Sequence, residues 1–116
     1  MSMRQDLETT VKKVQGLGRR AHAAHADVRD RTMLQDVVNV SVEQLGVWMG
    51  AVANARVLTS GTWDVVCDGD RRIMLDINLI GTWNTCVATT PHLLERGASL
   101  VNISSAAGTN PKSMPE

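Results

Sequence analysis

Polar residues that could bind a ligand or take part in catalysis follow three short apolar runs in this sequence of 116 residues. Asp27 ends the first run, Asn54 follows the second, and Ser104 and Ser105 follow the third. If the runs are parallel strands, these groups lie together, because ligands of an open parallel sheet bind outside the carboxyl ends of its strands. Asp27 could instead only cap a turn, and Asn54 could be a loop residue with positive φ. Taken together, the three positions predict one side of a binding cleft.

Segments with helical periodicity alternate with the apolar runs and would position these polar groups. The predicted order is a helix over about 6–17 stopped by Gly18, a strand over 20–28, a helix capped by Asp30 and ended by Gly46, a strand over 49–53, a loop to about 62, a long helix closed by Gly97, and a strand over 100–103. Such alternation predicts an α/β fold with a doubly wound parallel sheet in three α/β/α layers. The length allows a single domain over residues 1–116.

Composition and charge exclude several classes of function. Twelve basic and twelve acidic residues balance to a net charge of zero, which gives no attraction to nucleic acid or to an anionic membrane. No apolar run is long enough to span a bilayer, and the first residues do not resemble a secretory signal.

Cys67 and Cys86 have no metal-type spacing and form no disulfide framework, so we expect a reduced, cytoplasmic protein. His22 and His25 should point to opposite faces of a strand, and we expect no metal site.

Four motifs together identify a family. They are Ala26-Asp27-Val28, Ala53-Asn54-Ala55, Asp76-Ile77-Asn78-Leu79-Ile80-Gly81 and Val101-Asn102-Ile103-Ser104-Ser105-Ala106-Ala107-Gly108. In this order and spacing they resemble the classical short-chain dehydrogenase/reductase family, whose fold is a Rossmann-like NAD(P)-binding domain. Gly18-Arg19-Arg20 and Gly81-Thr82-Trp83-Asn84 are similar to the actinobacterial branch related to carveol dehydrogenases.

The resemblance implies which residues face the cofactor, which would be NAD or NADP. Asp27 corresponds to the residue that meets the adenine ring, with the backbone of Val28 beside it. Asn54 and Ala55 correspond to residues that line the cofactor cleft. Arg56 departs from the family, which usually has Gly at that position, and its side chain could either block the cofactor or pair with a phosphate.

The resemblance also implies catalytic roles for two residues. Asn78 corresponds to the active-site asparagine of the long helix, which holds a water for proton relay. Ser105 corresponds to the serine that donates a hydrogen bond to the reacting carbonyl or alcohol oxygen, where hydride transfer develops charge. We expect Asn78 and Ser105 to approach each other across one cleft, on the same side as Asn54.

Two parts of the family's machinery are absent from this sequence. Gly16-Leu17-Gly18 falls at a helix end, so no Gly-rich turn is present to hold the pyrophosphate. The sequence contains no Tyr, and the family's acid/base Tyr and its Lys would lie beyond Glu116. We therefore expect an incomplete internal piece of the domain, in which the first strand is separated from the second by two absent strands.

These observations leave two functional interpretations. The first is a fragment of an NAD(P)-dependent oxidoreductase that moves hydride between a small-molecule alcohol or ketone and the cofactor, inactive alone. The second is a non-catalytic, degenerate remnant that serves as an interaction module. In either case the long helix could support a homo-oligomer, and we expect Trp83 to be a packing residue.

Overall fold

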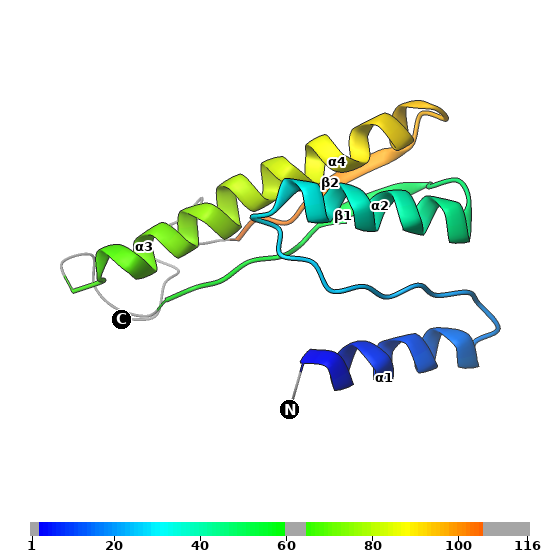
Figure 1. Ribbon diagram of the computed structural model, residues 1–116, viewed down its shortest axis with the longest axis horizontal. Coiled ribbons are helices and arrows are strands. Elements are labelled where there is room, and N and C mark those ends of the chain that lie inside the picture. Colours follow the sequence, from blue (N-terminus) through cyan, green and yellow to red (C-terminus); the bar gives the residue numbers. More distant parts are fainter. Residues whose placement is uncertain (1–2, 60–64, 106–116) are drawn as a thin grey trace.

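The computed structural model describes residues 3–59 and 65–105 of the chain. Its elements are α1 (Met3–Gly16), α2 (Arg31–Leu45), β1 (Gly50–Ala53), α3 (Asp68–Leu75), the π-helix η1 (Asp76–Gly81), α4 (Thr82–Leu94) and β2 (Ser99–Asn102) (Figure 1). In the described residues, no helix is both long enough and apolar enough to cross a membrane.

The sheet consists of β1 and β2, which pair in parallel. Val52 lies opposite Val101, and the Ile103 amide extends the ladder by donating to the Ala53 carbonyl over 3.1 Å. Both strands run toward the end of the molecule where α3 lies, so their carboxyl ends share one side (Figure 1). The parallel α/β fold predicted from the sequence is confirmed, and so are the strands expected near 49–53 and 100–103.

The prediction of a strand over residues 20–28 is wrong. This segment is extended but belongs to no sheet, and it runs between α1 and α2 (Figure 1). A strand is defined by the hydrogen bonds it exchanges with a neighbour, and no strand lies beside this segment in residues 3–59 and 65–105. Arg20 joins this segment to α2 by hydrogen bonds, because its guanidinium donates to the carbonyls of Gln44 and Leu45 over 3.3 and 3.2 Å.

The core lies where α4 packs on both strands of the sheet and α2 packs on α4. Its buried apolar side chains are Val38 of α2, Ala53 of β1, and Ala88 and Leu93 of α4. Alternation along β1 turns Ala53 into this core and leaves Val52 on the other face, 60% exposed.

The second helix begins and ends at the residues that the sequence indicates, whereas α1 begins at Met3, earlier than the predicted start near residue 6. The Asp30 side chain caps α2 by accepting from the Met33 amide over 3.0 Å. Gly46 ends α2 with a φ of 85°, and Gly18 follows α1 with a φ of 75°. Both values lie in the region that only glycine adopts without strain, which explains why the helices stop there.

The predicted long helix is continuous but not uniform, because α3 and α4 are joined by η1. A π-helix closes i→i+5 hydrogen bonds, is rare, and occurs frequently at functional sites. Side-chain hydroxyls bind backbone carbonyls here: Thr82 Oγ1 donates to the Asn78 carbonyl and Thr85 Oγ1 to the Gly81 carbonyl, both over 2.8 Å. The helix therefore changes its geometry at the segment that carries Asn78.

Candidate functional site

Asp27 lies at the end of the extended segment, in a turn closed by the Asp30 amide, which donates to the Asp27 carbonyl over 2.9 Å. Its carboxylate is held by Arg29, whose Nη2 approaches Asp27 Oδ2 to 2.6 Å and whose backbone amide donates to Oδ1 over 3.0 Å. These hydrogen bonds lower the pKa of Asp27 to about 2. The same pairing raises the pKa of Arg29. Asp27 is thus a fixed carboxylate at neutral pH.

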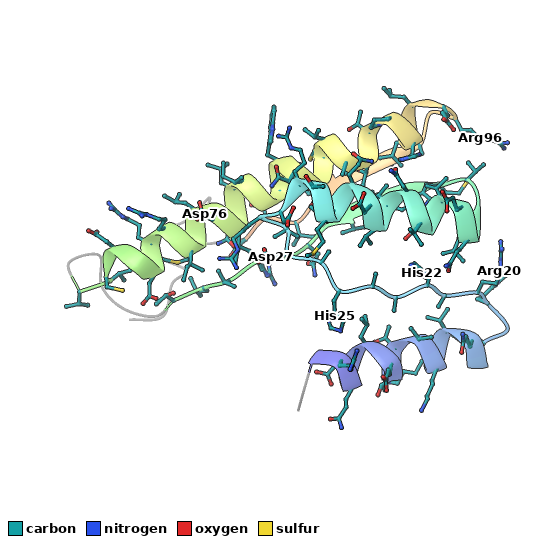
Figure 2. All side chains as sticks on the ribbon, in the orientation of Figure 1. Arg20, His22, His25, Asp27, Asp76 and Arg96 are labelled. Atoms are coloured by element: carbon teal, nitrogen blue, oxygen red, sulfur yellow. The ribbon has the colours of Figure 1, made fainter. Side chains whose placement is uncertain are left out.

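A groove of about 540 Å³ lies beside this turn. Asp27, Val28 and Arg29 line one side of it, and Ala55, Arg56 and Val57 line the other, with Ile77 of η1 between the two. Figure 2 shows Asp27 near the middle of the molecule, where the extended segment leads into α2. Three of the predicted cofactor residues therefore line one concave surface.

Asn54 directly follows β1 and is exposed, and it is not among the residues that line the groove. The loop that it begins does line the groove, from Ala55 to Val57. Arg56 in that loop is exposed and is one of the residues that line the groove.

Asn78 holds this same loop from η1. Its Nδ2 donates to the Val57 carbonyl and its Oδ1 accepts from the Val57 amide, both over 2.8 Å. The two bonds pair an amide side chain with a peptide group, so they fix both the position and the orientation of Val57. Asn78 therefore lies toward the end of the sheet at which Asn54 follows β1.

Ser105 lies three residues after the last residue of β2 and is exposed. Because β1 and β2 are parallel and in register, the segment after β2 leaves the sheet on the same side as the segment after β1. The approach of the Ser105 hydroxyl to Asn78 stays a prediction. Residues 106–108 of the serine motif and the tail from 109 onward lie outside the described residues.

The groove suits the adenine end of a dinucleotide better than the phosphates. Asp27 already accepts four hydrogen bonds from Arg29, which fill the about four lone-pair sites of a carboxylate, so an exocyclic amine would bind Asp27 by displacing one of them. The neighbouring peptide groups of the turn offer further polar atoms at the same edge, and Ile77 and Val57 provide apolar contact for a ring. For the pyrophosphate, Arg56 is the one cation on the opposite side of this groove.

A parallel sheet with ligand-facing polar residues at the carboxyl ends of its strands defines the nucleotide-binding class of open α/β proteins. Within that class the sequence matches the family described as short chain dehydrogenase, over residues 1–115. The chain belongs to the short-chain dehydrogenase family, and the fold class predicted from the sequence is confirmed with it.

Named relatives indicate which branch of the family this chain resembles. The chain is 43% identical over 107 residues to a (-)-trans-carveol dehydrogenase of Rhodococcus erythropolis, covering 89% of this chain and 38% of that protein. It is 42% identical to a putative short-chain type dehydrogenase/reductase of Mycolicibacterium smegmatis, again covering 38% of the relative. A crystal structure of carveol dehydrogenase from Mycobacterium avium in complex with NAD superposes with a TM-score of 0.89 at 42% identity, covering 95% of this chain and 41% of that one. The carveol-dehydrogenase-like branch is confirmed, and the chain spans about two fifths of the length of these relatives.

Gly81 and Asn84 contact the turn that carries Asp27, although neither was predicted as a site residue. A Cβ on Gly81 would clash with the Val28 side chain, and the Asn84 amide binds the Val28 carbonyl over 2.9 Å. A signal for Asn84 was present, since Ile77, Gly81, Asn84 and Ala88 follow the i, i+4, i+7, i+11 spacing of one helix face. A polar residue on such a face is expected to be buried with a hydrogen-bond partner.

Proposed function

We propose that these residues form the cofactor-facing part of an NAD(P)-dependent oxidoreductase that transfers hydride between a small-molecule alcohol and the corresponding ketone. Family membership supports this proposal, as does the NAD in the complex of the Mycobacterium avium relative. The observation that carries it is the groove in which the Asp27 turn faces the loop after β1.

In this proposal, Asp27 accepts from the adenine amine in place of one of its four bonds to Arg29, and the backbone of Val28 lies beside the ring. Ala55 lines the cofactor cleft on the opposite side, and Asn54 precedes it at the start of the loop that Asn78 fixes through Val57. The nicotinamide, when bound, supplies the hydride chemistry.

Ser105 donates a hydrogen bond to the substrate oxygen, on which negative charge develops during ketone reduction. Asn78 keeps one amide hydrogen and one lone pair beyond its two bonds to Val57, and these suffice to hold a water for proton relay. The acid/base step needs another group, because the sequence contains no Tyr. The 116 residues alone are therefore proposed to be inactive.

An interaction module is the second candidate, and one observation favours it. Large apolar side chains are exposed along η1 and α4, among them Leu79, Ile80, Trp83 and Val87. Trp83 is 61% exposed, so its assignment as a packing residue is wrong within this chain. An apolar stripe of this kind is suited to pairing with a second copy, which is the proposed route to a homo-oligomer.

The test is a chimera in which these residues replace the matching part of the Mycobacterium avium carveol dehydrogenase. We expect the chimera to oxidise carveol with NAD, and Ser105→Ala to lower kcat by about 10²–10³-fold, as removal of one donor to a developing oxyanion does. Ser104→Ala is the matched control and should change kcat only a few-fold.

Equal effects of the two serine substitutions would contradict the assignment of Ser105. A chimera that folds and binds NAD without turnover would contradict the oxidoreductase proposal and favour the interaction module.

A further inference from the structure

Asn84 of α4 is a buried amide, 4% exposed, whose hydrogen bonds all go to one short segment. Its Nδ2 donates to the carbonyls of Val28 and Arg29 over 2.9 and 3.4 Å. Its Oδ1 accepts from Arg31 Nε over 3.3 Å. A buried amide used in this way fixes the backbone of the segment, because each of its polar atoms would lose a partner if the segment moved.

Gly81, one helical turn before Asn84, sets how closely that segment approaches the helix. A Cβ at Gly81 would lie 2.5 Å from Val28 Cγ2 and 3.0 Å from Val28 Cβ. Only a residue without a side chain allows this contact. Gly81 thus permits the approach, and Asn84 holds the segment once it is there.

The segment is the side of the groove that carries Asp27. Its Asp27 carboxylate, Val28 and Arg29 all line the groove, and the Asn84 bonds reach the carbonyls of the latter two. The facing side is held separately, through the two bonds between Asn78 and Val57. Two asparagines of one continuous helix therefore fix the two sides of one groove, each through its own peptide groups.

We propose that Asn84 is a positioning residue for the adenine end of the cofactor, acting through the Val28 and Arg29 carbonyls to place Asp27. The inference rests on the proposed function, because it assumes that the groove takes the adenine ring. Asn84 itself touches no ligand, so its loss changes affinity for the adenine moiety and not the chemistry.

Asn84→Asp tests this assignment in the purified chain. The substitution keeps the size of the side chain and the acceptor for Arg31 but removes the donors to Val28 and Arg29. Asn39→Asp is the matched control, because Asn39 is exposed on α2 and its Oδ1 accepts from Gln35, which an aspartate also allows. Binding of AMP is measured by NMR titration, and hydrogen exchange is followed at the amides of residues 27–31 and of Val57.

We expect Asn84→Asp to weaken AMP binding about tenfold, the effect of losing one buried hydrogen bond, and to speed exchange in 27–31 while Val57 is unchanged. Asn39→Asp should alter neither. A merely structural role would instead speed exchange at Val57 as well and weaken AMP only in proportion to the unfolded fraction, which would overturn the proposal.

Gly81→Ala provides a second route if Asn84→Asp does not fold. The added Cβ would push Val28, and with it the same segment, away from the helix, so this substitution should also weaken AMP binding. Adding Val28→Ala to the same chain removes Cγ2 and should restore part of the AMP affinity. If neither substitution alters AMP binding, the proposed role of Asn84 is overturned, while the adenine groove itself is not. A wild-type chain that shows no AMP binding overturns the adenine groove and, with it, this inference.

Discussion

The two ends of the described structure differ in how they satisfy the hydrogen bonds of their backbone. From α2 onward, the strands pair, α4 packs on them, α2 packs on α4, and all the buried apolar residues of the described chain are found there. Before α2, α1 packs on no other described helix or strand, and no residue from Arg4 to Gly16 is buried. A helix closes its own hydrogen bonds, so α1 forms without another helix or strand packed on it, whereas the segment 20–28 needs a hydrogen-bonded partner to become a strand.

The largest expected difference between the two ends is in the response to loss of a leucine. Leu93→Ala removes a buried side chain of α4 and should lower the free energy of unfolding by about 2–5 kcal/mol. Leu7→Ala is the matched change in α1, where Leu7 is only partly covered, and it should cost well under half as much. Urea unfolding followed by circular dichroism measures both, and equal losses would contradict the division into a packed and an unpacked end.

Two glycines offer a sharper comparison with a smaller effect. Gly46→Ala forces a Cβ into a φ of 85° at the end of α2, which should cost about 1–3 kcal/mol of global stability. Gly18→Ala introduces similar strain at 75° after α1, but α1 can fray without disturbing the core. We expect a lower urea midpoint for Gly46→Ala only, with reduced helix content for Gly18→Ala. A common midpoint shift would show that α1 unfolds together with the rest.

The smallest effect concerns the Asp27–Arg29 ion pair at the boundary between the two ends. The pKa of Asp27 is lowered from 3.8 to about 2, so the pair contributes stability that is present above pH 3.8 and is lost as the pH falls through about 2. NMR titration of the Asp27 carboxyl carbon should give a midpoint near 2, and Arg29→Gln should return it toward 3.8. A wild-type midpoint near 3.8 would contradict the ion pair.

Most of the packed end could be predicted from the sequence, because its signals are local. Asp30 is a good N-cap residue, Gly46 is a good helix stop, and apolar periodicity marks α2 and α4. The π-helical geometry of η1 could not be predicted, since apolar periodicity does not distinguish it from an α-helix. The strand expected over 20–28 failed because strand formation depends on a neighbour, and extended propensity does not supply one.

For the site, the family motifs include residues on both sides of the groove but do not indicate what holds them. Asp27, Val28 and Ala55 line the groove and Asn54 lies outside its lining, while their contacts with a cofactor stay a prediction. The spacing along the helix marks Asn84 as a buried polar residue, but it does not identify its partners, because the three bonds of Asn84 span more than 50 positions in sequence.

The central claim is that these residues provide the cofactor groove and the serine of a short-chain dehydrogenase without its proton-exchanging residue. The most direct measurement mixes the purified chain with NADH or NADPH and a panel of ketones and follows the nicotinamide absorbance. We predict no turnover above background, because general acid/base catalysis contributes about 10²–10⁴-fold and no Tyr is present. Turnover that scales with the protein, disappears on Ser105→Ala and survives Ser104→Ala would contradict the claim.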